Sequence, residues 1–205
     1  MSPRAFDAKA LLRSLRRLDK ARRTAFAAAM ATRLLCAYEF VAADAKLNNG
    51  QVPRETVSAL WSALEGDTDE AVWRARLAEV TRLFPQDGEV EWSSVSPDQG
   101  WVLYAMADSG IAALMYAIEC WLTDDPQQAV WAAQRADDAS DQAAIALLNI
   151  EPLKQHEKRI QSHAVVQREL SRQAADLDWL ARCGSLPGLG QRALREPMLT
   201  EAELT

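Results

Sequence analysis

Two histidines, His156 and His163, are the first residues whose type and spacing suggest metal chemistry. His156-Glu157 begins like the HExxH pattern of zinc metalloproteases, but Ile160 stands where that pattern needs its second histidine. On a continuous helix the two histidines share one face about 10 Å apart, too far for one metal ion. We therefore expect hydrogen-bonded histidines in the core or at an interface, with a metal-ligand or proton-transfer role as the alternative.

Two carboxylates, Asp108 and Glu119, lie inside the apolar run 101–122. On a helix they project in nearly the same direction, about 16 Å apart along the axis. That distance excludes a paired general acid and base. We expect Asp108 to accept a hydrogen bond from a neighbouring Arg or Tyr, and the alternative is a functional buried carboxylate with a raised pKa.

Three further acids, Asp137, Asp138 and Asp141, form an acidic patch on one predicted helix. Clustered carboxylates attract hard cations, but calcium loops need a glycine turn and irregular backbone, which a helix lacks. The patch is therefore expected to be a solvated helix face. Its alternative role is a docking surface for a basic partner protein, because opposite charge speeds encounter.

The remaining reactive residue types form no catalytic set. Ser185 lacks a GxSxG neighbourhood, and the GxG at 188–190 follows a predicted helix rather than a strand. The three cysteines show no metal-ligand spacing and suit free thiols in a reducing compartment, and no apolar signal-peptide core follows Arg4. We predict no catalytic residues, no metal, no cofactor and a cytoplasmic location.

The elements that must position these residues are predicted to be helices throughout. Alanine is abundant, with 37 residues, while Gly and Pro number eight each, and this composition favours helix. Hydrophobic periodicity and capping residues predict seven helices. They cover about 7–18, 20–46, 53–64, 67–84 and 98–123, then one that opens at Asp125 and one over 152–182.

The apolar run 101–122 is long enough either to span a bilayer or to form a helix buried on all sides. Its two acids would cost about 2.5–3.5 kcal/mol each near mid-bilayer. Its flanks are acidic and offer no basic anchor. We therefore predict a buried central helix over 98–123 and no membrane span.

Charge and composition divide the chain unevenly. The net charge is −6, yet residues 1–33 carry nine Lys or Arg and only two Asp. No aromatic residue interleaves the cations between Arg13 and Arg23, so no nucleic-acid partner is expected. Residues 1–182 are expected to form one helical domain, and the Gly- and Pro-containing residues 183–205 a tail that drapes over it or stays mobile.

Several segments of the chain resemble the YjaG-like family of bacterial proteins, a domain-of-unknown-function family. The likeness covers about residues 11–182, in order and spacing more than in one sharp motif. It implies an all-helical fold and no established activity. It is carried by LRRLDKARRTAFAAAMATRLLCAYEFV at 15–41, VSALWSAL at 57–64, VLYAMADSGIAAL at 102–114 and EPLKQHEKRIQ at 151–161. The chain departs from the family at Thr32, Cys36 and Ala37, where relatives tend to have an acid, a proline and an asparagine.

The sequence thus predicts an all-α, single-domain bundle of about seven helices around a buried central helix. The expected function is non-enzymatic binding of another protein, or of a second copy as a homodimer. One version is an immunity-type protein that neutralises a basic toxin. The other class is a metal- or small-molecule-dependent enzyme in which Asp108, Glu119, His156 and His163 converge in the core. The candidate binding residues are these four with Asp137, Asp138 and Asp141.

Overall fold

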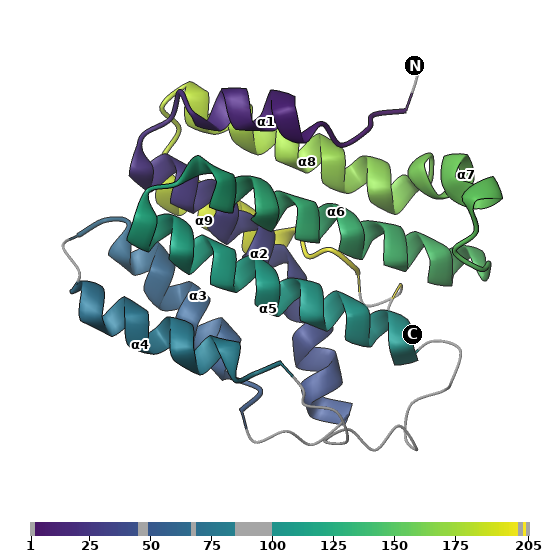
Figure 1. Cartoon of the computed structure of the whole chain (residues 1–205), viewed down its shortest axis with the longest axis horizontal. Helices are drawn as coiled ribbons and strands as arrows, with labels where there is room; N and C mark the ends of the chain where they lie inside the picture. The colour runs from purple at the N-terminus through teal and green to yellow at the C-terminus, as the bar shows by residue number, and fades with distance from the viewer. Residues whose placement is uncertain (1–2, 45–48, 67–68, 85–99, 201–202, 204–205) are drawn as a thin grey trace.

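In a computed structural model of the chain, residues 3–44, 49–66, 69–84, 100–200 and 203 are described. These residues form α-helices and no strand, which confirms the all-α prediction (Figure 1). The helices are α1 (Ala8–Leu15), α2 (Lys20–Asp44), α3 (Val52–Ala63), α4 (Glu70–Thr81), α5 (Gly100–Thr123), α6 (Pro126–Leu148), the short 3-10 helix η1 (Lys154–His156), α7 (Glu157–Gln161), α8 (Ala164–Ala181) and α9 (Leu186–Arg195).

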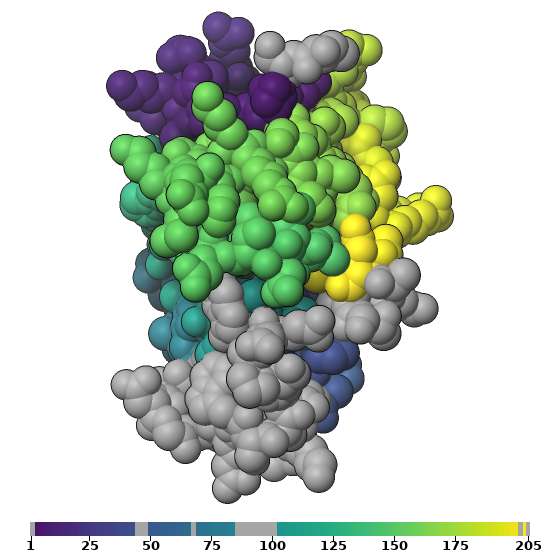
Figure 2. Space-filling view, turned by 90° about the vertical axis from the view of Figure 1, so that its right-hand side faces the viewer, coloured from purple at the N-terminus to yellow at the C-terminus, as the bar shows by residue number. Residues whose placement is uncertain are grey.

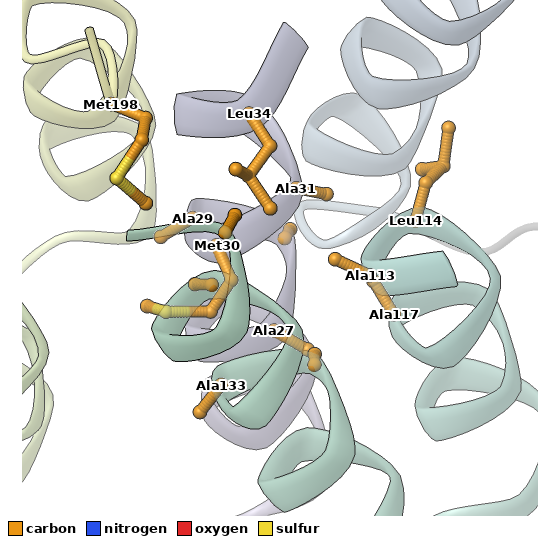
Figure 3. Packing of buried hydrophobic residues seen from close by; sticks show 14 of the residues in the cluster. Ala27, Ala29, Met30, Ala31, Leu34, Ala113, Leu114, Ala117, Ala133 and Met198 are labelled. Atoms are coloured by element: carbon orange, nitrogen blue, oxygen red, sulfur yellow. The ribbon is translucent and has the colours of Figure 1, made fainter. Parts of the chain in front are cut away.

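Helix α2 lies at the centre and contacts α3, α5, α6, α8 and α9. Its alanines make this possible, because small side chains let helices approach on several sides. Ala29 points towards the side where Met198 lies, and Ala31 points towards α5 (Figure 3). Gly110 of α5 lies against α2, where an added Cβ would be only 3.2 Å from Leu34 Cβ. The two longest helices therefore pack closely through small residues.

Helix α5 buries one side and leaves part of the other at the surface. Val102, Met106, Ile111, Leu114 and Ile118 are all buried in the core. Two stretches, Lys20–Ala43 and Val102–Thr123, are long and apolar enough to cross a membrane by length and composition, with 78% and 56% of their most apolar windows buried in the protein. Core helices of soluble proteins pass the same test, so this is weak evidence for a membrane span.

Helix boundaries follow the predicted caps in part. The Asp125 carboxylate accepts a hydrogen bond from Gln127 N at 2.9 Å, and α6 opens at Pro126, directly after the predicted start at Asp125. Helix α4 instead begins after Asp69, whose side chain accepts from Ala71 N at 2.8 Å. The predicted starts of the helices over 67–84 and 98–123, at residues 67–68 and 98–99, lie outside the described residues.

The predicted continuous helix over 152–182 is broken in the structure. After η1 and α7 the chain turns at Ser162, and α8 starts anew with His163 as its N-cap. The Ser162 hydroxyl donates to the Lys158 carbonyl at 2.8 Å, which satisfies one of the last acceptors of α7. His156 and His163 therefore do not share the face of one helix.

The C-terminal residues are folded rather than a simple tail. Ser185 caps α9 by accepting from Gly188 N at 3.3 Å. Beyond α9, Met198 and Leu199 are buried, and Met198 N donates to the Arg33 carbonyl of α2 at 2.8 Å. Figure 2 shows this segment, in yellow, along the flank of the green helices. Residues 186–199 thus complete the core of the helical domain.

Candidate functional site

Helices α5 and α6 are antiparallel neighbours joined by the short turn at Asp124-Asp125 (Figure 1). Residues spaced by three or four positions on each helix lie along one shared surface. We call this surface the α5/α6 face. It comprises Asp108, Ala112, Tyr116 and Glu119 from α5, and Trp131, Arg135, Asp138 and Asp141 from α6.

One end of the α5/α6 face forms an open cleft of about 410 Å³. The cleft brings together three of the residues singled out in the sequence, although one of them lies about 30 positions from the others. It is lined by Phe84, Ala105, Asp108, Ser109, Ala112, Arg135, Asp138, Asp141 and Gln142. The three carboxylates therefore form one site between two helices and not two separate features.

The cleft holds more negative than positive charge. Arg135 Nη2 lies 3.2 Å from Asp138 Oδ2, and the described residues supply no other ion pair to the three carboxylates. Burial raises the pKa of Asp108, and it raises the pKa of Asp138 against the opposing effect of Arg135. Burial, with repulsion from Asp138 and Glu157, raises the pKa of Asp141 to about 6. These carboxylates have lost part of their hydration, and the positive charge nearby does not fully compensate for that loss.

Several polar atoms at the cleft are buried without a hydrogen-bond partner. They are Asp141 Oδ1, Gln142 Oε1 and Arg135 Nε. Such atoms are uncommon in folded proteins, because an unmade hydrogen bond destabilises the structure. Two of the three are acceptors, so the cleft suits a ligand that donates hydrogen bonds and carries positive charge.

An aromatic pair continues the face beyond the cleft. The Tyr116 and Trp131 rings lie with centroids 5.5 Å apart at 46°, and Trp131 is 39% exposed. Glu119 follows Tyr116 by three positions and is partly buried. It does not line the cleft, so Asp108 and Glu119 are separate on α5, as their spacing predicts.

Asp137 occupies a different side of α6. Its pKa is raised to about 7 by burial, then by repulsion from Asp141, Asp138 and Glu169 of α8. It does not line the cleft. The acidic patch predicted on this helix is therefore divided, with Asp138 and Asp141 in the cleft and Asp137 facing α8.

The two histidines do not join the acids. His156 Nδ1 lies 3.0 Å from the Glu151 carbonyl, and His163 accepts from Val165 N at 3.4 Å as the cap of α8. Both are partly buried, and neither lines the cleft. Within the described part of the chain, no three His, Cys, Asp or Glu side chains are arranged to hold a metal ion. The convergence of Asp108, Glu119, His156 and His163 expected for an enzyme is not present.

A buried charge network, which the sequence did not reveal, lies between α2, α8 and α9. Arg33 Nε and Nη2 donate to the two oxygens of Glu169 at 3.0 and 2.9 Å, and Nη1 donates to Asp176 at 2.8 Å. Arg192 of α9 also donates to Asp176. Burial alone would lower the pKa of Arg33, but the two carboxylates outweigh it and raise that pKa. All of Arg33, Glu169 and Asp176 are inaccessible to solvent, so the network is structural.

The fold and family have known relatives. The chain is similar to a crystal structure of a DUF416 family protein from Shewanella baltica, with 15% identity, a TM-score of 0.68, and coverage of 90% of this chain and 93% of that one. No curated protein matches the chain. The model of the family described as "Protein of unknown function (DUF416)" matches residues 10–201, including the C-terminal segment that the YjaG-like resemblance left out. The chain therefore belongs to the DUF416 family of proteins of unknown function.

Proposed function

We propose that this protein acts by binding a basic protein partner through the α5/α6 face. The observation that carries the proposal is the junction of an acidic cleft with an exposed aromatic pair on adjacent helices. The cleft would accept a Lys or Arg side chain of the partner, and Tyr116 and Trp131 would pack against the surface around it.

The residue types on this face suit an interface. Trp, Tyr and Arg are enriched among the residues that dominate binding energy, because they bury a large area and still form polar contacts. Trp131 and Arg135 are one helical turn apart on α6, and Tyr116 of α5 lies against Trp131. Trp131 is 39% exposed and Tyr116 is partly buried, so a partner that covers this pair would bury further aromatic area.

Charge favours a basic partner over a second copy of the same chain. The face carries Asp108, Glu119, Asp138 and Asp141 against Arg135 alone. A two-fold dimer through this face would place like charges together, whereas a basic partner would relieve the unpaired carboxylates. An immunity-type protein that neutralises a basic toxin is one form of this proposal. The proposal is also compatible with membership of the chain in the narrower YjaG-like group.

The test is photo-crosslinking in the native host with a crosslinking amino acid at Ala112, in the middle of the face. Two variants of this crosslinking protein are then made. One carries Trp131→Ala, and the other carries Asp138→Asn together with Asp141→Asn. We expect both variants to lose the crosslinked partner. Phe40→Ala is the matched control, because Phe40 is 40% exposed on α2 and outside the face.

The purified partner then gives a quantitative measurement. Its affinity should fall as salt rises from 50 to 200 mM, and the double Asn variant should weaken this dependence. A partner with an acidic contact surface, or equal capture by all variants, would contradict the proposal. Crosslinks only to the chain itself, with a dimer in light scattering, would favour a homodimer instead.

A further inference from the structure

A second, apolar groove of about 400 Å³ lies between α3 and α9, on residues separate from the α5/α6 face. Its floor is formed by Leu35 of α2, Val57 and Trp61 of α3, and Gly190 of α9. Leu194 lines its edge and is 53% exposed. This volume and a mostly apolar lining with a few polar groups are typical of small-molecule sites.

The floor of the groove is rigid. The Trp61 indole N–H donates to Thr32 Oγ1 at 3.0 Å, and the Thr32 hydroxyl donates to the Ala28 carbonyl at 2.6 Å. Gly190 packs directly on the indole, since a Cβ there would lie 2.9 Å from Trp61 Cδ2. The ring is therefore fixed from two sides, and a ligand would meet a preformed apolar surface.

Cationic side chains border this apolar floor. Arg54 lines the groove and holds both oxygens of Glu39 at 2.5 and 2.7 Å. Arg195 lies one helical turn after the groove residue Gln191, on the same face of α9. Arg195 is exposed and forms no ion pair with any residue that the structure describes. The helical spacing therefore puts a guanidinium without an ion-pair partner among the described residues next to the residues that line the groove.

We propose that this groove binds a single-chain amphiphile with a carboxylate head, of the fatty-acid class. The chain lies on Trp61, Val57 and Leu194, and the carboxylate pairs with Arg195. Arg54 remains bonded to Glu39, which balances its charge, so the carboxylate is held by Arg195. An apolar floor beside an unpaired guanidinium matches the two ends of such a molecule, whereas a small anion or a purely polar ligand would leave the floor uncovered.

The first experiment separates the head from the chain. Calorimetric titrations of the full-length protein use decanoate and its uncharged analogue decan-1-ol. We expect Arg195→Gln to weaken decanoate about tenfold, the effect of one charge-assisted hydrogen bond, and to leave decan-1-ol unchanged. Arg182→Gln, at an exposed arginine paired with Asp178 on α8, is the control and should change neither.

The second experiment places the chain in the groove. Gly190→Val fills the floor against Trp61 and should abolish binding of both ligands, whereas Gly66→Val, at a site with no neighbour within 4 Å, should not. Leu194→Asp tests the same groove at an exposed position, so its result stands even if the Gly190 variant does not fold. Absence of decanoate binding to the unaltered protein, unchanged binding in Leu194→Asp, or equal loss of both ligands in Arg195→Gln would overturn the proposal.

Discussion

Arg33 is a fully buried cation whose N–H groups bond to Glu169 and Asp176 of α8. Removing the guanidinium leaves two carboxylates in the core, and among the described side chains their remaining hydrogen-bond partners are Gln173 and Arg192. We expect Arg33→Met to lower the free energy of unfolding by about 3–5 kcal/mol, because an uncompensated buried charge is strongly destabilising. Urea denaturation followed by circular dichroism measures the change.

The control for Arg33 is an exposed ion pair on a helix. Arg74 pairs with Glu70 one turn away on α4, and both side chains are mostly exposed. Arg74→Met should change stability by about 0.5 kcal/mol or less. Equal small effects at Arg33 and Arg74 would show that the buried network does not hold α2 against α8.

Gly110 is a position where one added methyl group is expected to change the stability of the protein. An added Cβ would lie 3.2 Å from Leu34 Cβ and 3.3 Å from the Leu34 carbonyl oxygen, and both belong to another long helix. We expect Gly110→Ala to destabilise the protein by about 1–3 kcal/mol, since the gain in helix propensity is smaller than the overpacking. Thermal unfolding measures the change. Gly66→Ala is the control, because Gly66 has open space around it. A Gly110→Ala variant more stable than the unaltered protein would contradict the prediction.

The sequence singled out some residues of the candidate site, and it missed the buried charge network for a physical reason. Asp108, Asp138 and Asp141 were predicted as binding candidates because charged residues stand out in apolar or clustered settings. Glu169 and Asp176 were not, because their partner Arg33 is 136 and 143 residues away. A signal was present: Glu169, Gln173 and Asp176 are spaced by four and three on one face of α8. Spacing alone does not show that such a face is buried.

At the scale of elements, long periodic helices were predictable and short ones were not. The predicted helices over 20–46 and 98–123 match α2 and α5 closely. The break at Ser162-His163 was missed because the apolar spacing continues across it. Helix α9 was missed because its two glycines and one proline disfavour helix locally, while burial of Leu189 and Ala193 stabilises it. Tertiary contacts, which a single sequence does not display, decided both cases.

Asp137 on helix α6 should make the stability of the folded protein depend on pH. Asp137 has a pKa raised to about 7 in the folded protein, against an ordinary value of 3.8. The folded state then binds more protons than the unfolded state between about pH 4 and 7, so this group lowers stability as pH rises through that range. Asp137→Asn removes the effect, so the variant should be stabilised relative to the unaltered protein at pH 8 and not at pH 4.

Urea midpoints of both proteins at pH 4, 6 and 8 measure this difference. Comparing variant with unaltered protein at each pH cancels the other titrating groups. Asp178→Asn, an exposed acid of α8 paired with Arg182, is the control and should show no such trend. A stability difference that is constant from pH 4 to 8 would mean that Asp137 is not perturbed by its surroundings.

At the scale of the whole molecule, the C-terminal segment joins parts that are far apart in sequence. Arg168 donates to the Met198 carbonyl at 2.9 Å, and Arg172 donates to the Pro197 carbonyl at 3.0 Å. Met198 is fully buried beside α2 (Figure 3). Gly190 supports Trp61 of α3. The segment thus closes the bundle on the side opposite the α5/α6 face and forms one wall of the apolar groove.

Deletion of residues 184–205 should therefore disrupt the whole bundle. It removes Arg192 from Asp176, Met198 N from the Arg33 carbonyl, and the buried side chains of Leu189, Ala193, Met198 and Leu199. The remaining helices can still form, but the exposed surface of α2 and the under-compensated carboxylates favour loose packing. We expect retained far-ultraviolet circular dichroism, weakened near-ultraviolet signals and a broad urea transition.

A single substitution tests the packing of the C-terminal segment without shortening the chain. Met198→Ala keeps the backbone bonds to Arg33 and Arg168 and removes only buried side-chain contacts, so it should lower stability by about 2–5 kcal/mol with a cooperative transition. If the deleted protein instead unfolds at the same urea concentration as the full chain, the C-terminal residues behave as the tail that their glycines and prolines suggest. In that case α2 must be covered adequately by α3, α5, α6 and α8 alone, and the groove proposed for an amphiphile would lack a stable wall.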